Sequence, residues 1–358
     1  MSALQIKDEM TPKERMKAYL GGEPFDRIPC GLMLSDYAAR VLGCSVREYQ
    51  LSAEVMAQGQ IAAWQRYGHD GINVGVGLTG IAEVLGSGVT FPENGAPYIS
   101  RPGLDDITKQ ESLPIPDTKT AGRFPLIMEA LERLLDGLGD TVPVSVSLPG
   151  PFTSAANTRG TEAFMRDLVK HPEAAHRLIR RALEVAVGFV VIAAPLGVKI
   201  SIGDPSASGA LISPRLFREF AQPYLKELSD AIIKHTGFGP SLHICGNTSK
   251  VWQEMADSGA GLLSLDNVID LAEAKAAVGG RVVLIGNIHP TATMFLGTPD
   301  DVRANARECL RKAWDSPKKF ILSLGCGLPI DTPQENIDAL MAAARSYGRY
   351  PLNPDNFS

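Results

Sequence analysis

A histidine and a cysteine two residues apart, His243 and Cys245, are the sharpest chemical signal in the sequence. Successive side chains of a β-strand point to opposite faces, so residues two apart project to the same side and can bind one metal ion. A neutral imidazole and a thiolate are ligands that zinc prefers. A second thiolate from Cys326, between Gly325 and Gly327, would give three protein ligands and leave one coordination position open, as a catalytic zinc site requires.

Ordinary packing is the alternative explanation for each of these residues. A cysteine in a buried strand is usually a small core residue, and short motifs such as His-x-Cys have modest specificity. The position of Cys326 at the end of another predicted strand strengthens the metal hypothesis, because ligands gather at strand ends in α/β barrels. For the remaining cysteines, Cys30, Cys44 and Cys309, we expect packing roles.

Buried-strand patterns alternate with helical patterns along the chain, which predicts an α/β fold with a parallel sheet, most simply a closed (β/α)8 TIM barrel. We expect a single domain over residues 1–350 and a tail over 351–358, with a hairpin-like excursion in residues 86–104 after the second strand. An open doubly wound sheet is the alternative, but no G-x-G-x-x-G follows the first strand. The eight predicted strands cover residues 27–34, 71–78, 142–148, 198–203, 241–245, 261–266, 281–287 and 319–325.

Two acidic residues follow predicted strands, where barrel enzymes carry their chemistry. Asp204 and Asp266 are therefore the candidate catalytic residues. Each could act as a general acid, accept a hydrogen bond from the substrate, or orient the metal ligand His243. Asp204 precedes Pro205, so it could also simply begin a turn.

Three further polar residues near strand ends, Ser147, Asn287 and Glu83, are the candidate substrate-binding residues. Glu83 could instead be a fourth, displaceable zinc ligand or a helix-start residue. His289 precedes a proline, and we expect it to shape the loop.

Composition describes an ordinary globular chain of 358 residues, with a net charge of −5, 21% charged residues and 44% hydrophobic residues. No basic excess favours nucleic acid or an anionic membrane surface. Residues 1–13 lack the apolar core of a signal peptide, and the apolar stretch 182–195 falls short of the ~20 residues needed to span a bilayer. Five cysteines, an odd number, favour a reducing compartment, so we expect a cytoplasmic location.

The chain resembles the uroporphyrinogen decarboxylase superfamily and, within it, the zinc methyltransferases that act with corrinoid proteins. This resemblance implies a (β/α)8 barrel in which His243, Cys245 and Cys326 bind Zn²⁺, and a cobamide carried by a separate corrinoid protein. It extends over nearly the whole length, through Glu14-Arg15, Asp26-Arg27-Ile28-Pro29, Ala82-Glu83-Val84-Leu85-Gly86, Gly150-Pro151-Phe152-Thr153, Asp204-Pro205-Ser206-Ala207-Ser208, His243-Ile244-Cys245-Gly246, Gly286-Asn287-Ile288 and Gly325-Cys326-Gly327.

The decarboxylase branch of this superfamily fits the sequence less well. Its members carry an arginine-rich segment after the first strand, whereas residues 35–40 contain one arginine, Arg40. Decarboxylation also leaves a metal triad unexplained. A metal-free decarboxylase-like enzyme and a structural zinc site stay as alternatives. No Asp-x-His-x-x-Gly cobalamin signature is present, so the cobamide would have to arrive on a partner.

The methyl donor or acceptor is a small molecule that the sequence leaves open. Zinc can lower the pKa of a thiol or polarise the oxygen of a methyl ether. Coenzyme M carries a sulfonate, which a cationic side chain should bind. The predicted strand ends, however, offer mainly acids, amides and prolines, and Arg159 is the nearest evident base. We therefore favour a methyl ether donor, such as an aromatic methyl ether, with methylcobamide:coenzyme M methyl transfer as the alternative. The direction of transfer and a homodimeric assembly stay open.

Overall fold

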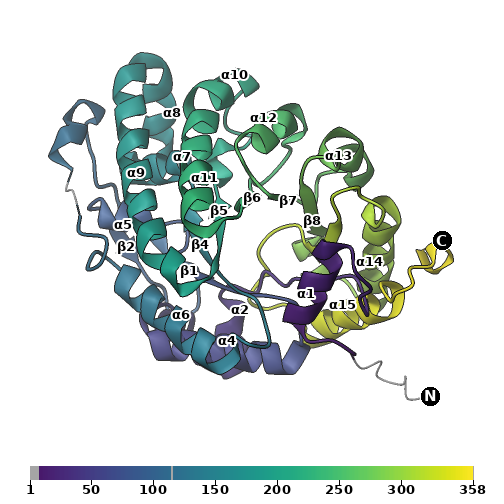
Figure 1. Cartoon of the computed structure of the whole chain (residues 1–358). Helices are drawn as coiled ribbons and strands as arrows, with labels where there is room; N and C mark the ends of the chain where they lie inside the picture. The colour runs from purple at the N-terminus through teal and green to yellow at the C-terminus, as the bar shows by residue number, and fades with distance from the viewer. Residues whose placement is uncertain (1–7, 114–115, 358) are drawn as a thin grey trace.

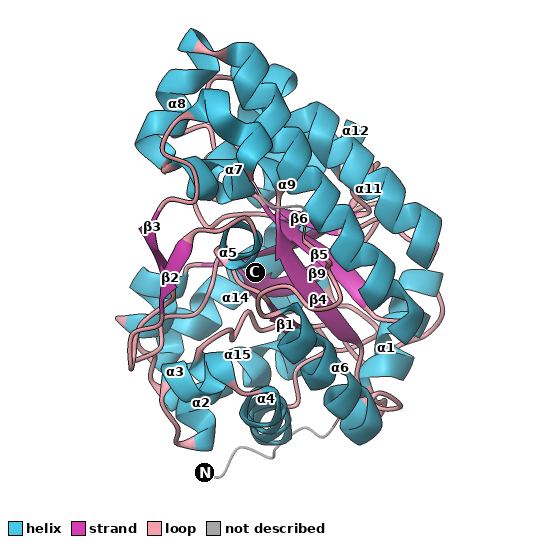
Figure 2. Ribbon diagram, turned by 90° about the vertical axis from the view of Figure 1, so that its left-hand side faces the viewer, coloured by secondary structure: helices cyan, strands magenta, loops and turns pink. Residues whose placement is uncertain are grey.

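Seven parallel strands form one curled sheet in the computed structural model, which describes residues 8–113 and 116–357. The strands are joined in the order β1-β4-β5-β6-β7-β8-β9, and helices surround them (Figures 1 and 2). This arrangement confirms the predicted α/β fold with a parallel sheet. The strand bounds are β1 (Ile72–Gly75), β4 (Val144–Pro149), β5 (Lys199–Gly203), β6 (Ser241–His243), β7 (Leu262–Ser264), β8 (Val283–Ile288) and β9 (Phe320–Leu324).

The first predicted strand, residues 27–34, contributes two isolated β-bridges, at Arg27 and Cys30, in place of a regular strand. Cys30 pairs in parallel with Leu322 of β9, and the Leu322 N–H donates to the Pro29 carbonyl at 3.0 Å. On its other side, the Cys30 carbonyl accepts from the Asp70 N–H at 2.9 Å, just before β1. Pro29 has no N–H to donate, which limits ladder pairing here. The segment nevertheless lies between the first and last strands of the sheet.

Side-chain caps fix where several of the helices begin. Thr11 and Glu14 form a reciprocal capping box at the start of α1, as their spacing predicts. Residues 45–67 have helical spacing throughout but form two helices, because Ser52 is extended at φ −133° and its hydroxyl caps the second helix. The helix bounds are α1 (Pro12–Gly21), α2 (Tyr37–Leu42), α3 (Val46–Leu51), α4 (Ala53–Tyr67), α5 (Gly80–Val84), α6 (Phe124–Leu138), α7 (Pro151–Arg159), α8 (Thr161–Lys170), α9 (Pro172–Ala193), α10 (Pro214–Leu216), α11 (Gln222–Thr236), α12 (Trp252–Asp257), α13 (Leu271–Val278), α14 (Pro299–Ala313) and α15 (Gln334–Tyr347).

Two short strands lie outside the main sheet, in the region expected to hold an excursion. β2 (Gly88–Thr90) pairs antiparallel with β3 (Tyr98–Arg101). At the other end of the chain, the tail contains a 3₁₀ turn, Pro354–Phe357, and the buried Phe357 ring packs 5.9 Å from Trp314. Within the described ranges, every helix is too short or too polar to cross a bilayer.

Small residues occupy the face of the sheet on which the metal-ligand candidates lie. The pairing register places Gly75, Ser147, Ser201 and Ser241 side by side across β1, β4, β5 and β6. His243 lies two residues beyond Ser241, so it shares this face and is one step closer to the carboxyl ends of the strands. The side chains next to His243 on that face are therefore small.

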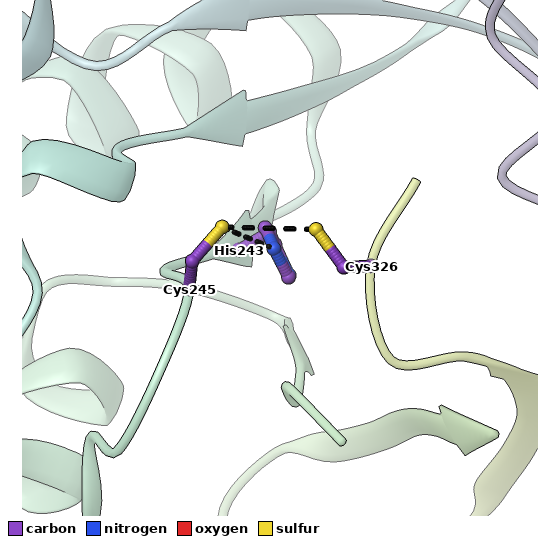
Figure 3. Close-up of side chains that lie close together, drawn as sticks. All are labelled: His243, Cys245 and Cys326. Atoms are coloured by element: carbon purple, nitrogen blue, oxygen red, sulfur yellow. Dashed lines mark hydrogen bonds between the residues drawn. The ribbon is translucent and has the colours of Figure 1, made fainter. Parts of the chain in front are cut away.

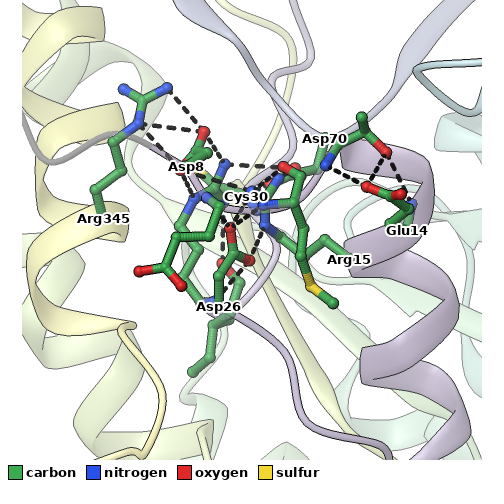
Figure 4. Close-up of polar contacts among 12 residues, drawn as sticks. Asp8, Glu14, Arg15, Asp26, Cys30, Asp70 and Arg345 are labelled. Atoms are coloured by element: carbon green, nitrogen blue, oxygen red, sulfur yellow. Dashed lines mark hydrogen bonds and ion pairs between the residues drawn. The ribbon is translucent and has the colours of Figure 1, made fainter.

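An ionic cluster ties the N-terminal segment to the amino-terminal side of the sheet (Figure 4). The Asp26 carboxylate accepts hydrogen bonds from Nε and Nη2 of Arg15, both at 2.6 Å, and from the backbone N–H groups of Glu9 and Met10. Burial alone would raise the pKa of Asp26, but these donors outweigh it and lower the pKa to about 2.

Acid should therefore remove the stabilisation that Asp26 provides. Because its folded-state pKa lies below the ordinary value of 3.8, this contribution is fully present above about pH 4 and is lost as the pH falls towards 2. We expect the difference in unfolding free energy between the wild type and Asp26→Asn to shrink over that window. Urea unfolding at a series of pH values measures it, and a difference that stays constant down to about pH 2 would contradict the expectation.

Candidate metal centre

Three side chains from two distant parts of the chain meet at the carboxyl ends of β6 and β9 (Figure 3). Nε2 of His243 lies 3.2 Å from Sγ of Cys245, and the two sulfurs of Cys245 and Cys326 are 3.8 Å apart. All three ligand atoms lie within 4.8 Å of one another. The sequence separation between the two thiols is 81 residues, so the fold alone brings them together.

The ring of His243 is oriented by β7. Its Nδ1 lies 3.2 Å from the carbonyl oxygen and 3.1 Å from the hydroxyl of Ser264, which pairs with His243 in the strand register. A carbonyl can only accept, so Nδ1 carries the proton and the lone pair of Nε2 points towards the cysteines. This tautomer is the one that binds a metal through Nε2. Ser264 went unrecognised in the sequence, although register places it beside His243 once strand order is known.

The contact between the two thiols shifts their pKa values in opposite directions. The hydrogen bond from the Cys245 thiol lowers the pKa of Cys326, and the N–H of Gly327 adds to the effect. The same contact with Cys326, reinforced by burial, raises the pKa of Cys245. A thiolate is therefore favoured at Cys326, and a cation between the sulfurs would favour a second thiolate, at Cys245.

This donor set fits zinc. One imidazole nitrogen and two sulfurs are borderline-soft ligands, and tetrahedral Zn²⁺ with Zn–S bonds of about 2.3 Å holds two sulfurs about 3.8 Å apart. The separation of Cys245 and Cys326, 3.8 Å, matches that value. Among the described residues, the cluster consists of His243, Cys245 and Cys326, so Glu83 does not join it. Their assignment as zinc ligands stays a prediction.

Asp204 lies beside His243 and has a fully buried side chain. Its backbone N–H donates to the His243 carbonyl at 2.9 Å, and Oδ1 accepts from the Thr153 N–H at the start of α7 at 2.7 Å. Oδ2 has no hydrogen-bond partner among the described residues, and burial raises the pKa of Asp204 to about 6. These contacts join β5, β6 and α7; a catalytic role for Asp204 stays a prediction.

The candidate substrate-binding residues lie in three different environments. Ser147 is half-buried on the face of His243, one step further from the carboxyl ends of the strands. Asn287 is buried, and its amide donates to the carbonyls of Asp266 and Ile269. Of the three, Ser147 is placed best to approach a ligand, and all three roles stay predictions.

Glu83 belongs to a separate polar network around a buried arginine. Its carboxylate accepts from Nε of Arg123 at 3.0 Å, while the other nitrogens of Arg123 donate to Gln50 and to the Val76 carbonyl. Arg123 was not recognised in the sequence. It lies at the start of a helix 40 residues from Glu83, and no local pattern links the two.

The fold and the site together place the chain in a known enzyme family. Residues 11–347 match the family described as "Uroporphyrinogen decarboxylase (URO-D)". The chain therefore belongs to the uroporphyrinogen decarboxylase family.

Within this family, the chain is similar to methyltransferases of Methanosarcina species. The methylcobamide:CoM methyltransferase MtaA of Methanosarcina barkeri is 30% identical over 345 residues, which cover 95% of this chain and 99% of the relative. The methylated-thiol–coenzyme M methyltransferase of Methanosarcina mazei is 28% identical over 342 residues, covering 94% and 90%. A solved structure of a methyltransferase from Methanosarcina mazei matches with a TM-score of 0.84 at 28% identity, covering 94% of this chain and 98% of that one.

These comparisons confirm the family resemblance found in the sequence and the expectation of an enzyme of the methyltransferase kind. They also bear on the choice of small molecule. The names of both relatives specify coenzyme M, whereas the methyl ether donor favoured from the sequence has no counterpart in them.

Proposed function

We propose that the protein is a zinc-dependent methyltransferase that moves a methyl group between a small molecule and the cobamide of a separate corrinoid protein. The observation that carries the proposal is the convergence of one imidazole and two thiols at the carboxyl ends of the strands. The methylcobamide named for MtaA supports the choice of cobalt as the methyl carrier. Zinc bound at this triad would act as a Lewis acid that lowers the pKa of a substrate thiol or polarises an ether oxygen.

The chain's own residues determine how the ion would be held. The contact with Ser264 fixes the His243 ring so that Nε2 faces Cys245. Two thiolates, Cys245 and Cys326, would balance the double charge of Zn²⁺. A substrate thiolate held there would then keep its electron density and remain a nucleophile, because the protein ligands have already neutralised the ion.

A thiol of the coenzyme M type is the small molecule that we favour, as a methyl acceptor. In this reaction the thiol loses its proton and its sulfur takes the methyl group. The electron pair of the broken cobalt–carbon bond stays on the cobalt, which becomes cob(I)alamin. Support comes from the charge balance of the donor set and from the coenzyme M specified in the names of two relatives.

A methyl ether donor is the second candidate because of the position of Arg159. In the sequence this arginine was the nearest evident base for a sulfonate, but its Nε pairs with the Asp167 carboxylate at 2.8 Å. A sulfonate would have to compete with that carboxylate. A neutral ether would have no need of the cation.

The test is a spectroscopic assay of cobalt methylation with zinc-loaded protein and a purified corrinoid protein. We expect coenzyme M to convert the methylated cobalt to cob(I)alamin, and a phenyl methyl ether to leave cob(I)alamin unchanged. Methylation of cob(I)alamin by the ether alone would select the second candidate. An unchanged cobalt spectrum with both compounds, although zinc is bound, would overturn the proposed function.

A further inference from the structure

Cys245 lies beyond the end of its strand. Sequence alternation predicts a strand over residues 241–245, but β6 ends at His243. The chain turns at Gly246, whose φ of +76° lies in the left-handed region that suits glycine. A Cβ at Gly246 would lie 2.9 Å from the hydroxyl of Ser208, so a side chain there would crowd Ser208 and strain the turn. The position of the Cys245 sulfur therefore depends on whatever holds the peptide between Cys245 and Gly246.

Asp266 holds that peptide. Its Oδ2 accepts a hydrogen bond from the Gly246 N–H at 2.7 Å, and its Oδ1 accepts from the Val268 N–H at 3.1 Å. The residue is only 8% exposed, so water competes little for these bonds. A charged acceptor makes the stronger kind of hydrogen bond with a backbone donor. Both oxygens are thus engaged by the backbone, one of them directly beside a metal-ligand candidate.

Asn287 fixes the loop that carries Asp266. Its side-chain nitrogen donates to the Asp266 carbonyl at 2.9 Å and to the Ile269 carbonyl at 2.7 Å. The oxygen of the same amide accepts from the thiol of Cys309, on α14, at 3.6 Å. The loop after β7 is therefore attached to β8 and α14, and the carboxylate of Asp266 has a rigid support.

We propose that Asp266 is a positioning residue that fixes the turn after Cys245, and through it the Cys245 thiolate, for metal binding. The identity of the metal rests on the proposed function, but the role of Asp266 does not depend on which small molecule carries the methyl group. A general acid would need an oxygen free to approach the substrate. The backbone contacts of Asp266 instead match a residue that supports a metal ligand from outside the coordination sphere.

Zinc affinity separates these two roles, and Asp266→Asn is the variant to test. One amide oxygen cannot replace two carboxylate oxygens that each accept from a backbone N–H, so the turn should loosen while side-chain size is kept. We expect zinc to bind about 10–100-fold more weakly in competition with a chromophoric chelator. In the Co²⁺-substituted protein, the thiolate-to-cobalt absorption should fall as well.

Asp270 supplies a matched control in the same loop. Its Oδ1 also accepts from two backbone N–H groups, those of Ala272 and Glu273, but at the start of α13 and away from the metal-ligand candidates. Asp270→Ala should lower the thermal unfolding temperature, since it removes a helix cap, and leave zinc affinity unchanged. The apoprotein of Asp266→Asn should unfold near the wild-type temperature, and the rise in that temperature on adding zinc should be smaller.

Three results would overturn the positioning role. Zinc affinity of Asp266→Asn within about twofold of wild type, together with a slower methyl transfer at saturating zinc, would make Asp266 a catalytic acid. Equal loss of zinc affinity in the Asp266 and Asp270 variants would indicate general destabilisation. Failure of the wild type to bind zinc would overturn the proposed function itself, a result distinct from the other two.

Discussion

Substitution of Cys326 by serine is expected to remove bound zinc and methyl transfer together. The thiol lies 3.8 Å from Cys245, and a hydroxyl is a much poorer zinc ligand than a thiolate at neutral pH. Two remaining ligands, His243 and Cys245, would hold the ion weakly. Loss of several kcal/mol of Lewis-acid assistance corresponds to a fall of about 10³-fold or more in the methyl-transfer rate. Metal analysis of the purified variant and the cobalt methylation assay measure the two effects.

Cys44→Ser is the matched control for this experiment. Cys44 is also a free, partly buried cysteine, but its sulfur contacts the Ala39 carbonyl at 3.6 Å, outside the cluster of metal-ligand candidates. We expect the control to keep its zinc and most of its activity. Full activity of Cys326→Ser without metal would refute the zinc-dependent mechanism. Loss of folding together with the metal would instead show that the zinc is structural.

The metal-ligand cluster could be predicted because the residue types and spacings that indicate it occur within short stretches of the sequence. His243 and Cys245 are two residues apart, and Cys326 follows a strongly apolar segment between glycines. Strand periodicity was sufficient to place all three at the carboxyl ends of strands. Strand periodicity did not show that β6 ends before Cys245. A strand ends where its ladder partner ends, and the residues after His243 lie against the loop that follows β7.

The strand count was harder to predict than the fold class. The apolar run from Ile28 to Leu34 reads as a buried strand, yet only Cys30 forms a bridge. Ladder pairing depends on the neighbours, and Pro29 cannot donate to one. In the same way, the helical spacing of residues 45–67 gave no sign of the break at Ser52, which depends on that residue's own backbone angles and hydroxyl.

The long-range polar contacts could not be predicted from the sequence. Asp26, Arg27 and Asp70 look like ordinary surface charges in a linear reading, since charged residues are rarely buried. In the fold, Asp70 and Arg27 are 4% and 2% exposed. The ion pair between Arg27 and Asp70 joins two segments that are 43 residues apart in the sequence. Their proximity follows only from the folded path of the chain around the sheet.

Asp70 is the centre of the ionic cluster on the amino-terminal side of the sheet (Figure 4). Its Oδ1 accepts from Nη1 of Arg15, and its Oδ2 accepts from Nη1 of Arg27 and from the Cys30 N–H at 2.7 Å. Both arginines have almost fully buried side chains. Burial alone would lower the pKa of Arg27, but the charges of Asp70 and Asp8 outweigh it and raise that pKa. The carboxylate of Asp70 therefore compensates charge that water cannot reach.

We expect Asp70→Ala to lower the free energy of unfolding by about 3–5 kcal/mol. The substitution leaves the buried Arg15 and Arg27 with less compensating charge, and it leaves the Cys30 N–H without its acceptor. Chemical denaturation at neutral pH measures the change as a lower midpoint. Asp338→Ala is the matched control: Asp338 pairs with Arg66 at 2.6 Å, but both side chains are more than 40% exposed. That pair should contribute about 1 kcal/mol or less, since water screens it. Similar losses in the two variants would mean that burial does not set the strength of the Asp70 contacts.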